Sequence, residues 1–170
     1  MALFGKLTGT RRLPEGVSPV PAEELREALL GLDQPDRPYV IRHGGGKRCD
    51  LLAEWRLTEP VWKQVFVQSR ISHAGWIRMR LDHREHELRA LEEQWEVKRV
   101  GHPTRLEVMS EYTRGPSQTV SREWTIGRGE GGRPELTEAF GFNGAELREP
   151  LRDTVLKLGW SRREVVFGRL

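Results

Sequence analysis

The sequence predicts an α+β fold in which a mainly antiparallel sheet, strongly curved or partly closed, carries two to three helices packed on it. Three observations support this class. Residues 76–82 alternate between apolar and polar side chains with the period of two that is typical of a strand. Residues 150–158 carry apolar side chains at helical spacing between a proline and a glycine. Along the chain the elements follow the order helix, hairpin, helix, meander, helix and strand.

We expect one domain over residues 21–170, preceded by an N-terminal arm over residues 1–20 that is rich in glycine and proline. A chain of 170 residues is long enough to bury a core without disulfides, and its six tryptophans supply large apolar area. The single cysteine, Cys49, has no second cysteine with which to form an internal disulfide. Apolar runs of the length of a membrane span or a signal peptide are absent from the sequence. These features predict a cytoplasmic protein without a membrane span.

The first half of the chain predicts two helices and a hairpin. The first helix occupies residues 21–32, with leucines at helical spacing on one face. The hairpin joins residues 39–41 to the alternating segment 51–57 through three consecutive glycines. The second helix begins at Thr58, a good N-terminal cap, and runs to about Ser69.

The meander begins with the strand of residues 76–82. Residues 88–100 are predicted as the next strand, with a bulge near Glu92 that reconciles two opposite alternations. A helix over the same residues stays open as an alternative, because the segment is rich in Glu, Leu and Lys. Two more strands are expected over residues 106–112 and 120–126.

The last part of the chain predicts a loop, a short strand, a helix and a closing strand. Residues 127–134 contain four glycines and predict a flexible loop, and residues 139–142 form the short strand. Pro150 is expected in the first turn of the helix and Gly159 just past its end. Residues 165–170 are apolar on both faces, which predicts a strand that is central in the sheet or covered by the helix.

The charge pattern disfavours nucleic-acid binding. The net charge is only +3, from 28 Lys and Arg against 25 Asp and Glu. The basic residues are interleaved with acids and do not form a run, so the pattern predicts a solvated exterior with many ion pairs. A weak nucleic-acid binder stays an alternative, and it would show affinity that falls steeply with salt.

The cluster around His83, Glu85 and His86 has the most catalytic appearance in the chain. Two histidines can ligate a metal, and a glutamate between them can act as a base. The histidines are three residues apart and no pattern places a third ligand, whereas zinc proteases of the HExxH type need a spacing of four. A polar hairpin turn explains the cluster better. A metal- or acid/base-dependent hydrolase or isomerase using His83 and His86 is the alternative.

The glycines at residues 44–46 resemble a phosphate-binding loop, because Lys47 and Arg48 follow them. The serine or threonine that must follow the lysine of a phosphate loop is missing, so a flexible hairpin loop is the better interpretation. The basic neighbours of Cys49 would favour a reactive thiolate only if they lie close in space. We therefore expect an inert thiol.

A third group lies on the strand of residues 76–82, where Trp76, Arg78 and Arg80 share one face. An aromatic ring among arginines can stack on a planar group or bind an anionic ligand. Cross-strand pairing and partial burial of the tryptophan explain the same pattern structurally. The acids within reach for such pairing are Glu85, Glu87 and Glu93.

Several segments resemble a group of small uncharacterised actinobacterial proteins. They are the opening MALFGKLTGTRR, the stretches PAEELREALL, DLLAEWRL and RMRLDHREHELRALEEQWEV, and the closing GWSRREVVFGRL. The resemblance covers most of the chain and implies a bacterial cytosolic setting. It supplies no catalytic motif, cofactor or binding residue.

These observations together favour a non-catalytic module that binds a small ligand or another protein, because the sequence places no acid, base and nucleophile at a recognisable spacing. Trp76, Arg78 and Arg80 are the candidate contact residues, and the expected ligand is a small anionic or aromatic molecule or a second protein. The sequence predicts neither a metal site nor a cofactor.

Overall fold

The computed structural model describes residues 16–45, 48–68, 73–114, 124–128, 134–138, 144–166 and 170. Residues 108–114, 124–128, 134–138 and 144 are described by their backbone alone. Most of the expected N-terminal arm, the expected strand at residues 139–142 and most of the loop between residues 127 and 134 lie outside the described residues.

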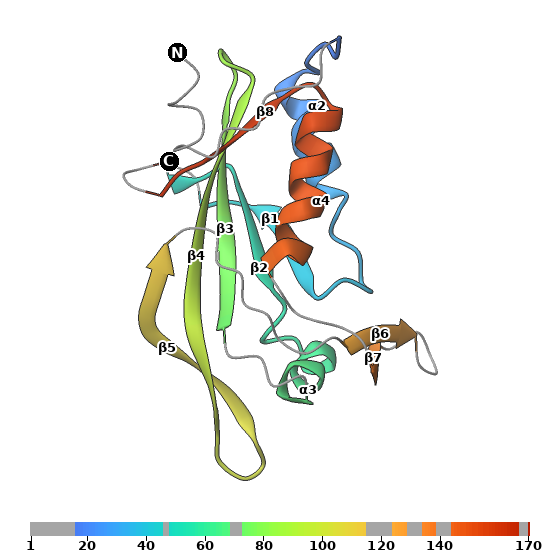
Figure 1. Ribbon diagram of the computed structural model, residues 1–170, viewed down its shortest axis with the longest axis vertical. Helices are drawn as coiled ribbons and strands as arrows, with labels where there is room; N and C mark the ends of the chain where they lie inside the picture. Colours follow the sequence, from blue (N-terminus) through green and yellow to red (C-terminus); the bar gives the residue numbers. More distant parts are fainter. Residues whose placement is uncertain are drawn as a thin grey trace.

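The described elements confirm an α+β fold (Figure 1). Strands β1, β2, β3, β4 and β5 pair in that order, β8 pairs with β4, and β6 and β7 form a separate two-stranded sheet. The elements are α2 (Ala22–Leu30), β1 (Tyr39–His43), β2 (Leu51–Trp55), α3 (Pro60–Gln68), β3 (His73–Asp82), β4 (Glu87–Val100), β5 (Arg105–Arg114), β6 (Trp124–Arg128), β7 (Pro134–Glu138), α4 (Gly144–Lys157) and β8 (Ser161–Glu164).

The large sheet is mixed, and it is neither closed nor strongly curled, so the expected mainly antiparallel and curved or partly closed sheet is wrong. The pairs from β1 to β5 are antiparallel, but β8 returns from α4 and runs parallel to the start of β4. A helical crossover of this kind is the usual way to bring a strand back in parallel. β8 and β5 share the edge of β4 that faces away from β3: β8 pairs with the N-terminal end of β4 and β5 with its C-terminal end. β1 is the last strand on the other side of the sheet.

Strand β4 settles the open alternative for residues 88–100, because it is a strand throughout. Its register with β3 is continuous from His73↔Glu96 to Asp82↔Glu87. The bulge lies between Trp95 and Val97, where β4 pairs with β5, and not near Glu92. Burial of alternate side chains against two neighbouring strands outweighs the helix propensity of this Glu- and Leu-rich segment.

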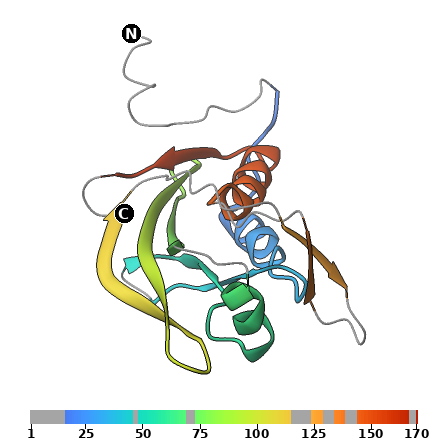
Figure 2. The same cartoon turned by 60° about the horizontal axis from the view of Figure 1, so that its bottom comes forward.

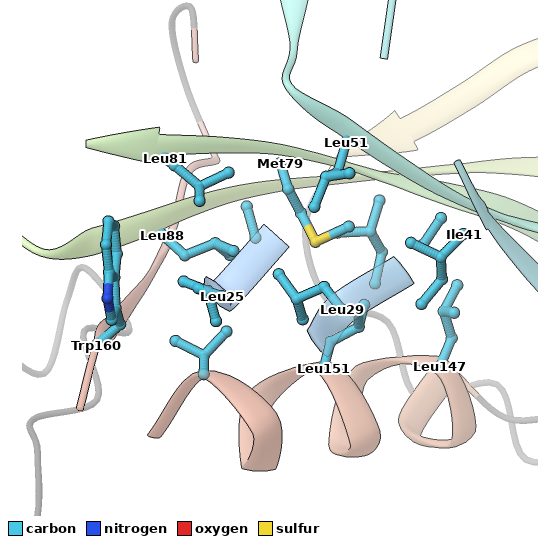
Figure 3. Packing of buried hydrophobic residues seen from close by; sticks show 14 of the residues in the cluster. Leu25, Leu29, Ile41, Leu51, Met79, Leu81, Leu88, Leu147, Leu151 and Trp160 are labelled. Carbon is cyan, nitrogen blue, oxygen red and sulfur yellow. The ribbon is translucent and has the colours of Figure 1, made fainter. Parts of the chain in front are cut away.

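Helices α2 and α4 lie side by side on one face of the sheet, as the two views show (Figures 1 and 2). Their leucines interdigitate with alternate residues of β1, β2, β3 and β4 (Figure 3). We call this the helix-covered face. Its buried core consists of Leu25, Leu29, Tyr39, Ile41, Leu51, Ala53, Ile77, Met79, Leu81, Leu88, Ala90, Leu147, Leu151, Val155 and Trp160. A second, smaller core joins α3 to the ends of β3 and β4 through Trp62, Val65, Phe66, Ala74 and Val97.

Helix α4 starts six residues earlier than predicted, and Pro150 lies inside it and not in its first turn. Proline has no N–H to donate to the carbonyl four residues back. Burial of Leu147, Leu151 and Val155, on both sides of Pro150, offsets this missing hydrogen bond and keeps the helix continuous. The predicted end is confirmed. Gly159 has a φ of 81°, and the N–H groups of Gly159 and Trp160 donate to the carbonyls of Leu156 and Val155 at 3.1 and 3.0 Å, which is a Schellman motif.

The closing strand also differs from the prediction. Of the strand expected over residues 165–170, the described residues 165, 166 and 170 are not in a strand, and β8 occupies the preceding charged segment Ser161–Glu164. Val165 continues the ladder through one hydrogen bond, from its N–H to the carbonyl of Ala90 at 2.8 Å, and residues 167–169 lie outside the described residues. The periodicity of apolar residues misses β8 because its most buried residue is an arginine, Arg162.

The side chain of Arg56 links the segment after α2, strand β1 and the residue before α3. Its side chain is 10% exposed, and its Nε donates to the carbonyl of Tyr39 at 3.0 Å. Its Nη1 lies 2.5 Å from a carboxylate oxygen of Glu59, and its Nη2 pairs with Asp33. The described part of the chain has no helix long and apolar enough to span a membrane.

Candidate functional site

The His83–His86 segment is the turn between β3 and β4, as the polar-turn interpretation predicts. The carboxylate of Asp82 accepts the N–H groups of Arg84 and Glu85 at 3.1 and 3.3 Å, which closes the turn. The rings of His83 and His86 stand edge-on to the ring of Trp160, with centroids 6.5 and 5.3 Å away. Both histidines therefore pack on Trp160. Among the described residues, no three His, Cys, Asp or Glu side chains are grouped to hold a metal.

The glycine loop closes a hairpin. The N–H of Gly44 donates to the carbonyl of Asp50 at 2.8 Å, and a β-carbon at Gly44 would collide with the backbone of Cys49. Cys49 is buried. Gly44 is thus explained by a close approach of two backbones. Gly46 and Lys47 lie outside the described residues.

Trp76 and Arg78 lie on the face of β3 opposite the helix-covered face, and the β3–β4 register places Trp76 directly across from Glu93. The indole Nε1 of Trp76 donates to Oε2 of Glu93 at 2.5 Å, and Nη2 of Arg78 lies 3.4 Å from the same oxygen. The guanidinium of Arg78 also lies over the indole of Trp76, 5.4 Å from the ring centroid. The ring of Trp95 lies 3.7 Å from that of Trp76. We call Trp76, Arg78, Glu93 and Trp95 the tryptophan patch.

Arg80 is not part of this patch. Its Nη1 donates to the backbone oxygen of Leu170 at 2.8 Å, so it holds the end of the described chain against β3. The sequence therefore predicts two of the patch residues, and Glu93 only as a structural partner. Trp95 is missed, although counting outward from the 83–86 turn places it near Trp76 in the register.

A second group of charged side chains lies on the helix-covered face, between α4 and the edge where β8 meets β4. Nε of Arg148 lies 3.1 Å from Oε2 of Glu92, and Nη2 of Arg162 lies 2.8 Å from Oε1 of Glu164. The amide of Gln94 donates to Oε1 of Glu92 at 3.0 Å. We call Glu92, Arg148, Arg162 and Glu164 the α4–β8 charge cluster.

Glu92 and Arg162 are buried, Arg148 and Glu164 are partly buried, and this burial perturbs the titration of the cluster. Desolvation raises the pKa of Glu92, and Arg148 opposes this increase. Desolvation likewise raises the pKa of Glu164, against the effect of Arg162. The pKa of Arg162 is lowered by burial. Perturbed buried charges of this kind occur in functional sites and in structural ion networks alike. Sequence reasoning misses the whole cluster, because Arg162 and Glu164 look like exposed residues.

No protein-family model, no curated protein and no solved structure matches the chain. The implied bacterial cytosolic setting therefore stays a prediction. Function has to be inferred from the tryptophan patch and the α4–β8 charge cluster.

Proposed function

We propose that this protein is a non-catalytic binding module that contacts its ligand through the tryptophan patch. The observation that carries this proposal is the pair of partly exposed indole rings in direct contact, on the sheet face opposite α2 and α4. Tryptophan and arginine are the residues that most often supply binding energy in protein interfaces. They are also the side chains that stack on planar ligands.

The patch is held in place before any ligand binds. Glu93 is only 3% exposed, and its Oε2 accepts the indole N–H of Trp76 while Arg78 lies beside it. The indole of Trp76 is therefore fixed from below by a hydrogen bond and from the side by Trp95. A contact surface whose side chains are already ordered loses little conformational entropy on binding.

The chemistry of the patch favours a planar aromatic group that carries negative charge. Its ring can stack on Trp76 or Trp95, and its charge can meet Arg78, whose side chain is 29% exposed. A small aromatic acid has this chemistry. The patch offers no nucleophile, and the carboxylate that it contains is occupied as a hydrogen-bond acceptor.

The two alternatives are a hydrolase or isomerase that uses His83 and His86, and a weak nucleic-acid binder. The described residues offer no observation in favour of either. His83 and His86 both pack on Trp160, and among the described residues no third metal ligand is grouped with them. The arginines of the same sheet face are paired with acids, as in Arg42 with Glu54 at 2.6 Å and Arg89 with Asp82 at 3.0 Å. These pairs balance the charge locally, whereas a nucleic-acid interface needs a contiguous positive patch.

The test uses tryptophan fluorescence and native mass spectrometry of the full chain. We expect naphthalenesulfonate, as an aromatic anion, to quench the fluorescence with saturation, and the Arg78→Gln variant to weaken its binding about tenfold. The matched control is Arg42→Gln, which removes an arginine from the same face at β1. Native mass spectrometry of protein purified from its own host should show a retained mass that is lost in Trp95→Ala. Equal binding by the Arg78 and Arg42 variants would contradict the proposal.

A further inference from the structure

The guanidinium of Arg162 is the least satisfied charged group in the described part of the chain. Its side chain is 6% exposed, and its Nε and Nη2 are buried without a hydrogen-bond partner. The β4–β8 register places Arg162 beside Leu88, so its side chain lies on the helix-covered face, beneath α4. Native proteins rarely leave buried polar atoms in this state, and an absent ion or water is a common reason.

The two unsatisfied atoms point to one kind of partner. Nε and Nη2 form one edge of the guanidinium, and their parallel N–H groups match the two oxygens of a carboxylate or phosphate. Glu164 lies close to this edge, with Oε1 2.8 Å from Nη2, but without the geometry of a hydrogen bond. The edge is therefore close to a carboxylate that does not satisfy it.

The surrounding charges favour an anion at this edge. Two arginines of α4, Arg148 and Arg152, lie near enough to Arg162 to lower its pKa. Arg152 pairs with Asp153 at 2.8 Å, so within the cluster two arginines, Arg148 and Arg162, face the carboxylates of Glu92 and Glu164. Protonation of either carboxylate leaves an excess of positive charge. The side chains of Arg148 and Arg152 are 19% and 29% exposed, so they reach from the cluster toward the surface.

We propose that the α4–β8 charge cluster binds a small oxyanion, a carboxylate or a phosphate, which bridges Nε and Nη2 of Arg162. This site is separate from the tryptophan patch and does not depend on it, because the two lie on opposite faces of β4. Arg148 adds a second positive charge, and Glu164 has to turn away from Nη2 to admit the anion.

Binding at this site is coupled to proton uptake. Burial raises the pKa of Glu92 and of Glu164, and an added anion raises both further. A protonated carboxyl can donate a hydrogen bond to the anion. The groups that face these two acids are Arg148 on α4, Arg162 on β8 and Gln94 on β4, and Glu164 also faces Glu92; Arg152 on α4 faces Arg162. The affinity should therefore rise as the pH falls.

The test measures binding of acetate and of inorganic phosphate to the full chain by calorimetry, at an ionic strength held constant with chloride. We expect saturable binding of at least one of the two anions, tighter at pH 5.5 than at pH 8. Proton uptake should appear as a binding enthalpy that changes with the ionisation enthalpy of the buffer. Arg162→Lys keeps the charge but loses the two-atom edge, and it should weaken binding at least tenfold. Arg89→Lys, on the opposite face, is the matched control and should bind as the natural chain does.

The outcomes separate an anion site from a structural ion network. Binding of acetate alone assigns a carboxylate ligand, and binding of phosphate alone a phosphate. If neither anion binds beyond the effect of chloride, or if Arg162→Lys binds as tightly as the natural chain, the cluster is only structural and the proposal is wrong. Should Arg162→Lys fail to fold, Glu92→Gln takes its place. This variant should keep binding at pH 5.5 but take up fewer protons on binding, because residue 92 no longer titrates. An unchanged proton uptake and pH dependence in both Glu92→Gln and Glu164→Gln would overturn the coupling.

Discussion

Glu92 and Glu93 are neighbours on β4, both are buried, and they face opposite sides of the sheet. Glu93 lies across from Trp76 and accepts its indole N–H in a short, directed hydrogen bond. Glu92 accepts from the amide of Gln94 through Oε1 at 3.0 Å, and its Oε2 meets the guanidinium of Arg148 at 3.1 Å without the geometry of a hydrogen bond. The contact of Glu93 with Trp76 is a directed bond, whereas the contact of Glu92 with Arg148 rests mainly on charge.

This difference shows that burial alone does not reveal what a charged side chain does. A buried carboxylate with a directed donor fixes its neighbours, as Glu93 fixes Trp76. A buried carboxylate near an arginine whose N–H groups are not all hydrogen-bonded leaves hydrogen-bonding capacity for something else, as in the surroundings of Glu92 and Arg162. We therefore expect Glu93, which has a directed donor in Trp76, to contribute more to the stability of the fold than Glu92.

The largest expected effect is that of Glu93→Ala. This change leaves the indole N–H of Trp76 without its acceptor and Arg78 without its buried partner, so it should lower the free energy of unfolding by about 3 kcal/mol. Urea denaturation measures the loss. Glu54→Ala, which breaks the more exposed pair with Arg42, is the control and should cost less than about 1 kcal/mol. Equal losses in the two variants would remove the distinction that we draw between the acids.

An intermediate effect is expected on the helix-covered face, from replacing Glu92 and Arg148 by methionine singly and together. Each single change leaves an opposite charge buried and should cost about 2 kcal/mol. The double variant removes both charges and should lie within about 1 kcal/mol of the natural chain, because methionine fills the space without desolvated charge. A double-mutant cycle by urea denaturation checks this, and strict additivity of the two single losses would argue against a coupled pair.

The fold could be predicted from the sequence where apolar periodicity is strong. The strand at residues 76–82 and the end of the last helix at Gly159 are confirmed for this reason. The start of α4 is missed because Pro150 resembles a first-turn residue, and β8 is missed because Arg162 carries no apolar signal. Periodicity detects apolar burial, so it cannot detect a strand whose buried residue is charged.

The candidate site is predicted only in part, for a related reason. Alternation on β3 places Trp76 and Arg78 on one face, but the partners Glu93 and Trp95 depend on the register of β4. The α4–β8 charge cluster requires the parallel pairing of β8, which joins residues about 70 positions apart in the sequence. The sequence contains no local signal for such a contact.

The smallest expected effect concerns Glu146, a third partly buried acid, at the start of α4. Desolvation raises its pKa from 4.5 to about 8, while Arg37 opposes this increase. The folded chain therefore binds the proton more tightly than the unfolded chain, so the stabilisation is complete below pH 4.5 and is lost as the pH rises to about 8. Because the side chain is partly exposed, solvent screening reduces the effect to about 1 kcal/mol.

Glu146→Gln stays neutral at every pH and should remove this loss. Urea denaturation across pH 5 to 9 should show the variant close to the natural chain at the acid end and more stable by about 1 kcal/mol at the alkaline end. Glu27→Gln, on the exposed side of α2, is the matched control for loss of one acidic side chain. If the two variants follow the same curve, the environment of Glu146 does not favour its neutral form.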